Sequence, residues 1–262
     1  MSDLIERGVS RVCYGRMPLP DGRRGRRIEQ VIIDRPQANC ALDYHLVLPA
    51  PGTGDGKGIL VEEFTRQDDF SANGLHSASW TPGFGWWSSA SLSRDLRSDP
   101  AALARVVPAE RAGAADAYRR LGGGDLPSEA ALRTYFRDHQ PIATAPPLRL
   151  GPTQPPDGFH ERRVYRVLFA RDLRTDQVAA LRALWRAAGG GAAGSVADGR
   201  RESGGDQFTW ELRRVAHTLA WCLDVTVLMR TDAVDAVRAT LTDLTNLLRR
   251  YGLIVVTTER FS

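Results

Sequence analysis

The chain has 262 residues, of which 42% are hydrophobic and 25% charged, so we expect a soluble globular protein with one large or two ordinary domains. No apolar run approaches the roughly 20 residues that a membrane-spanning helix needs, and we expect no membrane partner. The formal net charge of +4 at first suggests an anionic partner.

The basic residues are almost all arginine, and they are dispersed along the chain. Lys57 is the only lysine, which together with the richness in Ala and Gly indicates the coding bias of a GC-rich, bacterial genome. One basic cluster lies on a predicted turn, where we favour a solvated turn over phosphate contact by arginine forks. The cluster consists of Arg23, Arg24, Arg26 and Arg27.

The N-terminus and the cysteines together predict the cell compartment. Residues 1–10 contain Asp3 and Glu6 and no apolar core, so we do not expect them to form a secretion signal. The three cysteines are widely spaced, which argues against a disulfide framework and a zinc site. We therefore expect a cytoplasmic protein without a metal or cofactor.

The first part of the chain, residues 1–145, predicts a β-rich domain followed by helices, with α+β character. Alternating or apolar runs bounded by turn residues indicate four strands, at 9–17, 28–34, 41–48 and 58–64. Helical spacing then predicts three helices, at 100–106, 109–121 and 127–139.

Two segments rich in Pro or Gly divide the rest of the chain. Residues 146–160 predict a semi-rigid, proline-rich connector, which is the expected domain boundary. Residues 161–262 then predict an α/β domain, interrupted by a flexible, Gly-rich loop at 189–205.

The most regular pattern of the whole chain predicts a helix over 231–252. Thr231 or Asp232 is the expected N-cap, Gly252 the C-terminal cap, and an apolar strand follows at 253–256. Six apolar residues at spacings of three or four form its buried face: Val234, Val237, Leu241, Leu244, Leu248 and Tyr251.

Residues 206–230 fit two patterns. We favour a helix over about 206–221 that turns into a strand at 224–229. The alternative is two strands, which would give the domain a ferredoxin-like β-α-β-β-α-β order.

A Gly-rich stretch around Lys57 imitates a phosphate-binding loop. The first glycine of that motif would fall on Pro51, Gly58 stands where Ser or Thr is needed, and a strand follows instead of a helix. We therefore interpret residues 52–58 as a hairpin connection.

Weak candidates for catalysis are Asp43, His45 and His76. On a strand, Asp43 and His45 point to the same side, so the carboxylate could orient and charge the imidazole for acid–base work. We favour the simpler interpretation of a solvent-facing polar pair, because no nucleophile or second base accompanies them.

Three tryptophans, Trp80, Trp86 and Trp87, lie in a stretch rich in Ser and Gly that predicts an irregular loop or short β segments. Aromatic side chains on a loop are suited to binding another protein. The alternative is that they fold back and cover the N-terminal core.

These features favour a non-enzymatic adaptor that acts through contacts with another protein. One alternative is a small-molecule-binding protein or enzyme with a pocket around His45 and His76. The weakest alternative is a nucleic-acid binder that uses the cluster of Arg23 to Arg27 and the arginines near Arg213.

Overall fold

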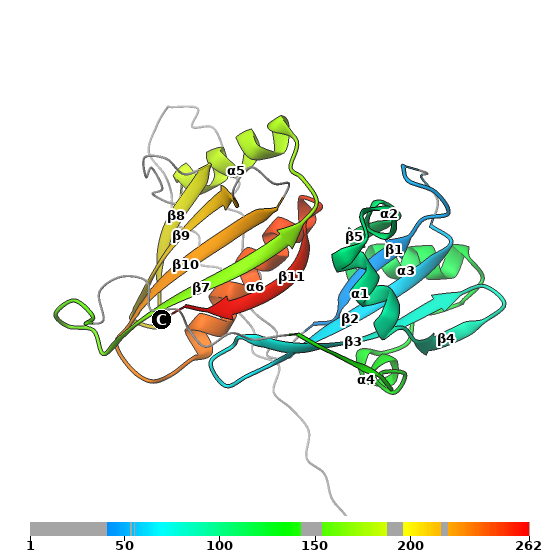
Figure 1. Cartoon of the computed structure of the whole chain (residues 1–262), viewed down its shortest axis with the longest axis horizontal. Coiled ribbons are helices and arrows are strands. Elements are labelled where there is room, and N and C mark those ends of the chain that lie inside the picture. The colour runs from blue at the N-terminus through cyan, green and yellow to red at the C-terminus, as the bar shows by residue number, and fades with distance from the viewer. Residues whose placement is uncertain are drawn as a thin grey trace, which may run out of the picture. The chain divides into compact units, whose positions relative to one another are not determined.

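A computed structural model describes residues 41–52, 54, 56–142, 154–187, 196–215 and 220–261. These residues belong to a compact unit that extends over 37–262. Helices and two antiparallel sheets make up the unit, so the mixed α+β class is confirmed (Figure 1). The arginine cluster at 23–27, the strands predicted at 9–17 and 28–34, and most of the proline-rich connector lie outside the described residues.

The first sheet has the strand order β4-β3-β2-β1-β5, and β6 also pairs with β3. The predicted strands at 41–48 and 58–64 are confirmed as β1 and β2. The Lys57 backbone N–H donates to the Val47 carbonyl at 2.7 Å, which closes the hairpin between them. The strands are β1 (Asp43–Val47), β2 (Gly58–Arg66), β3 (Ala72–Thr81), β4 (Gly85–Ser88), β5 (Val106–Ala109) and β6 (His139–Pro141).

Helices cover both faces of this sheet. Residues 58–62 of β2 are all buried, although neighbouring side chains on a strand point to opposite faces. One face packs against α3 (Arg111–Arg120) and α4 (Glu129–Arg133). The other packs against α1 (Ala90–Ser98) and α2 (Pro100–Ala104). The helices predicted at 100–106 and 109–121 are confirmed as α2 and α3 except at their facing ends, where residues 106–109 form β5. The helix predicted at 127–139 is shortened to α4.

The tryptophan-containing stretch is more regular than the sequence suggested. It forms the β3–β4 hairpin, in which Ala78 pairs with Ser88 and Thr81 with Gly85, and α1 follows directly. Of the two alternatives, the β segments are confirmed and the irregular loop is wrong. Buried Ser and Ala side chains occupy much of β3, and such small residues carry little β-strand signal although they allow close packing on both faces.

The second sheet has the order β11-β7-β10-β9-β8, and one of its faces forms a large apolar core with two helices. Its side chains accordingly alternate between buried and half-buried along β7 and β10. Helices α5 (Thr175–Ala187) and α6 (Asp235–Arg250) cover the apolar face. The strands are β7 (Glu161–Ala170), β8 (Ala197–Ser203), β9 (Asp206–Arg214), β10 (Trp221–Met229) and β11 (Ile254–Arg260).

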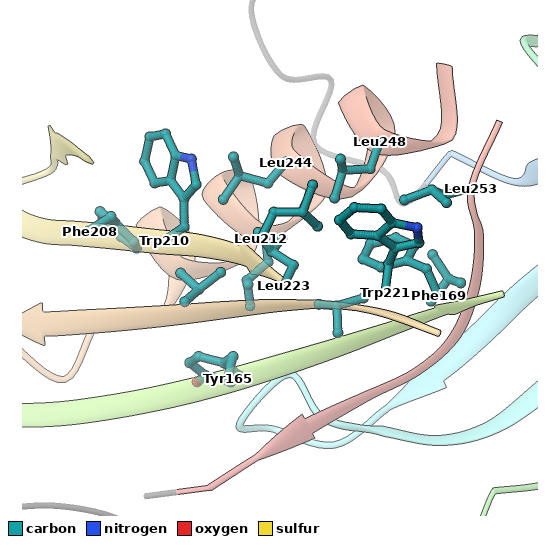
Figure 2. Packing of buried hydrophobic residues seen from close by; sticks show 14 of the residues in the cluster. Tyr165, Phe169, Phe208, Trp210, Leu212, Trp221, Leu223, Leu244, Leu248 and Leu253 are labelled. Atoms are coloured by element: carbon teal, nitrogen blue, oxygen red, sulfur yellow. The ribbon is translucent and has the colours of Figure 1, made fainter. Parts of the chain in front are cut away.

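The helix favoured over 206–221 is wrong, because residues 206–214 form β9 and Trp221 begins β10. Arg214 pairs with Trp221, and the Val215 N–H donates to the Ala220 carbonyl at 3.0 Å. Phe208 and Leu212 lie four residues apart, which suits one face of a helix and also one face of a strand. Trp210 lies between them in the sequence and is buried in the same core (Figure 2). Every second residue therefore faces the core, as in a strand.

The flexible loop predicted at 189–205 also needs correction, because residues 197–203 form β8 and pair with β9. At Gly199 an added Cβ would come within 2.5 Å of the Trp210 ring. That glycine therefore permits close packing in a strand instead of adding flexibility. Gly204 and Gly205 form the turn to β9 with φ of 64° and 87°.

Helix α6 bears out the clearest sequence pattern. Leu244 and Leu248 are buried and point from α6 toward the strands, as Figure 2 shows. Gly252 has φ of 94°, as expected of a left-handed C-terminal cap. The predicted N-cap is wrong: the helix begins at Asp235, and Val234 occupies the cap position without a side-chain hydrogen bond.

Replacing Leu244 with Ala should lower the free energy of unfolding by about 2–5 kcal/mol, because it removes buried methyl groups and leaves a cavity. Arg238 lies on the exposed side of the same helix, and Arg238→Ala should cost less than about 0.5 kcal/mol. Urea denaturation of both variants measures the difference. Equal losses would show that the buried face of α6 is assigned wrongly.

Candidate functional site

Trp80 and Trp86 pack on the face of the first sheet that α3 and α4 cover, and they do not form an open surface. Trp80 is 6% exposed, and its ring lies 4.4 Å from that of Tyr118 on α3. The Trp86 ring lies 5.8 Å from Tyr118 and 5.9 Å from Tyr135, and its indole N–H donates to the Tyr118 hydroxyl at 3.3 Å. These two tryptophans anchor the hairpin to the core.

The tip of the same hairpin presents Phe84 to solvent. Phe84 is 76% exposed, and the only other exposed large hydrophobic side chain among the described residues is Leu184, at 43%. Trp87, the third predicted tryptophan, is half-buried and meets the Phe84 ring edge-on at 5.1 Å. Gly83 and Gly85, with φ of 81° and 78°, form the turn that holds Phe84 outward.

The sequence interpretation did not single out Phe84. An aromatic residue flanked by two glycines is itself a signal, because a tight turn has little capacity to bury the side chain at its tip. We name Phe84, Trp87 and the connecting residues the hairpin surface.

His45 is buried, so the expectation of a solvent-facing pair with Asp43 is wrong. Its Nε2 lies 3.1 Å from Oε2 of Glu62 on β2, and both residues are 1% exposed. Asp43 instead pairs with Arg249 of α6. The two side chains point to the same face of β1, as predicted, but they serve different partners.

Arg97 of α1 completes a buried charge cluster with His45 and Glu62. Its two terminal nitrogens donate to the two Glu62 carboxylate oxygens at 2.8 and 3.0 Å, and one of them also donates to the Ser93 carbonyl at 2.7 Å. Burial alone would raise the pKa of Glu62. The opposing charge of Arg97 and the hydrogen bond with His45 outweigh burial and hold that pKa below its ordinary value.

His76 lies on the opposite face of the sheet from His45. Both histidines have backbone pairing partners on β2. His45 on β1 pairs with Leu60, and His76 on β3 pairs with Glu63, which lies three positions further along β2. Because side chains alternate along β2, the two histidines point to opposite sides. His76 stacks on Phe136 at 6.0 Å, and its Nδ1 lies 3.0 Å from the Asp138 carbonyl oxygen. The structure does not bring His45 and His76 into one pocket.

A cavity of about 670 Å³ lies beside Tyr44 and is lined in part by Arg111, Glu129, Arg249 and Arg250. The Tyr44 hydroxyl accepts a hydrogen bond from Arg111 and donates to Glu129 Oε1 at 3.2 Å. Burial, together with the Glu129 charge, raises the pKa of Tyr44 to about 12. The phenol therefore stays protonated at neutral pH and can donate a hydrogen bond, but it cannot act as a base.

The arginines near Arg213 are engaged in ion pairs. Arg213 and Arg166 both donate to Asp224, at 2.8 and 2.7 Å, and Arg214 pairs with Asp172 at 2.7 Å. The two carboxylates offset two of the three positive charges, so these residues add little to a surface for phosphate.

Three further observations concern the described residues as a whole. They contain no cluster of three or more His, Cys, Asp or Glu side chains able to hold a metal ion. None of their helices is both long and apolar enough to cross a membrane. Comparison of the chain with protein-family models, curated proteins and solved structures finds no match.

Replacing Arg97 with Met should leave the buried Glu62 carboxylate without its main counter-charge and lower stability by about 3–5 kcal/mol at neutral pH. The pKa of Glu62 is lowered in the folded chain, so the ionised carboxylate stabilises the fold at pH values above its ordinary pKa of 4.5. This stabilisation is lost as the pH falls below 4.5. The deficit of the variant should therefore shrink between pH 7 and pH 3, as urea denaturation at several pH values would measure.

Arg94 is the matched control, because it lies on the same helix and forms only an exposed pair with Asp95. Arg94→Met should change stability by less than about 0.5 kcal/mol. A pH-independent deficit in Arg97→Met, or one no larger than that of the control, would contradict the assigned charge cluster.

Proposed function

We propose that this chain is a non-enzymatic adaptor that docks another protein through the hairpin surface. The single observation that carries the proposal is the 76% exposure of Phe84 at the tip of the β3–β4 hairpin. Aromatic side chains supply large contact area with few rotatable bonds, and they are common among the residues that dominate binding energy.

The anchoring of the hairpin supports this function. Trp80 and Trp86 pack against Tyr118, and α1 follows β4 without a long linker. A loop that is already fixed loses less conformational freedom on binding than a mobile one. Phe84 can therefore enter a partner's pocket without ordering the chain around it.

The chemistry of the tip favours an apolar partner surface. Residues 81–85 are Thr81, Pro82, Gly83, Phe84 and Gly85, none of which carries a charge. A partner needs an apolar pocket for the Phe84 ring, flanked by groups that can pack against the edge of the Trp87 ring. We place the protein in the cytoplasm, as the sequence favours.

Phe84→Ser should abolish capture of the partner from a lysate of the native cells while leaving the melting temperature within about 2 °C of the wild type, because an exposed side chain contributes little to folding. Leu184→Ser is the matched control, since Leu184 is the other exposed large hydrophobic residue among those described. Its partner capture should be unchanged.

Trp86→Ala is the contrasting variant, because Trp86 packs against Tyr118 and Tyr135 and is expected to act on folding. Removing its side chain should lower the free energy of unfolding by about 3–5 kcal/mol, as for other packed aromatics. Partner capture that survives Phe84→Ser, or that Leu184→Ser abolishes equally, would exclude the hairpin surface as the docking site.

The second candidate function is small-molecule binding, now favoured by the cavity at Tyr44 instead of a pocket around His45 and His76. The Tyr44 hydroxyl, Arg111 and Glu129 offer both donors and an acceptor for a polar ligand. A compound that raises the melting temperature of the wild type but not of Tyr44→Phe would support it. Nucleic-acid binding through Arg23 to Arg27 remains the third and weakest candidate.

We also propose a finer description of the fold. Residues 161–262 would form a separate domain of ferredoxin-like type, joined to residues 1–145 by the connector at 146–160. The strand order β11-β7-β10-β9 and the helices between the strands support this, with β8 as an additional edge strand.

A further inference from the structure

A second cavity, of about 270 Å³, lies on the face of the first sheet that α1 and α2 cover. Its walls are mostly apolar, and its lining includes Val47, Trp87, Leu92, Ala102 and Val106. The volume is near the lower end of the range for small-molecule sites. The body of any ligand here must therefore be small and apolar.

Ser79 supplies the cavity with a buried polar group. The residue is 2% exposed, and its hydroxyl oxygen has no hydrogen-bond partner among the described residues. Ser79 pairs with Leu60 on one side and with Trp87 on the other, so its side chain points to the face where the cavity lies. A buried hydroxyl without a partner is unfavourable, and a ligand oxygen within reach would relieve this.

The charged residues of the lining are both cationic. Lys57 and Arg105 line the cavity, and its lining contains no carboxylate. Within the described part of the chain Lys57 has no acidic partner, and the one side-chain hydrogen bond of Arg105 goes from Nε to the Leu48 carbonyl at 3.4 Å. The local charge therefore favours an anionic ligand.

We propose that this cavity binds a small apolar carboxylic acid, aromatic or short-chain. The apolar body packs among Trp87, Leu92 and Val106, and the carboxylate pairs with Lys57 and Arg105. A ligand oxygen also hydrogen-bonds to the Ser79 hydroxyl. This site is distinct from the Tyr44 cavity, and the proposal does not depend on the hairpin surface being a docking site.

Titration of the full chain with benzoate, followed by two-dimensional NMR, tests the proposal. Benzoate should cause saturable shifts at the Ser79 amide and the Trp87 indole. Benzyl alcohol, which keeps the ring but lacks the charge, should bind about tenfold more weakly or worse. Lys57→Met should weaken benzoate binding by a similar factor.

Two variants of α2 provide a matched pair. Ala102 lines the cavity, so Ala102→Leu should fill it and abolish the saturable shifts. Ala101 is exposed on the same helix and lies outside the lining, so Ala101→Leu should bind benzoate like the wild type. A thermal melt of each variant establishes that it is folded.

Absence of saturable shifts in the wild type would overturn the proposal. So would equal benzoate binding by folded Ala102→Leu and Ala101→Leu, because the ligand would then lie elsewhere. Benzyl alcohol binding as tightly as benzoate, or Lys57→Met binding like the wild type, would overturn the assignment of a carboxylate ligand. None of these results depends on partner capture through Phe84.

Discussion

The first sheet is buried on both faces, and this constraint governs the residues around it. Glu62 lies on the central strand β2 and has no route to solvent, so its charge must be matched inside the protein. Arg97 binds both carboxylate oxygens, and His45 contacts one of them from the neighbouring strand. The charge cluster therefore fixes α1 against the sheet, since a shift of the helix would leave a buried charge without its partner.

The fixed position of α1 has consequences for the hairpin that precedes it. The Ser89 N–H donates to the Ser77 carbonyl at 3.1 Å, so the end of β4 and the start of α1 are held on β3. Trp80 and Trp86 anchor the other face of the hairpin on Tyr118. Phe84 is then left at a turn supported from both sides. Trp87 contacts Phe84 and also lines the smaller cavity, so the proposed docking surface and the proposed acid site share one side chain.

Segments with one clear apolar pattern were predictable from sequence, and segments that fit two patterns were not. Helix α6 repeats its apolar spacing over four turns, so its position and buried face could be predicted, and β1 and β2 carry enough β-branched and apolar residues to be recognised. The prediction for residues 206–214 failed because the spacing of Phe208 and Leu212 suits both a helix and a strand. The partner of His45 could not be found, because it depends on the register of β1 on β2 and on an arginine 35 residues away from Glu62. Phe84 was missed although the glycines on both sides of it are a sequence signal for a tight turn with an exposed side chain at its tip.

The central claim is that Phe84, held outward by a rigid hairpin, contacts a partner protein. The most direct measurement places a photo-reactive amino acid at position 84 of the full chain in its native cells, and at position 86 as the comparison. The account predicts a crosslinked species of higher mass from position 84 and none from position 86, where the side chain packs against Tyr118 and Tyr135. Crosslinking from position 86 alone, or from neither position, would contradict it.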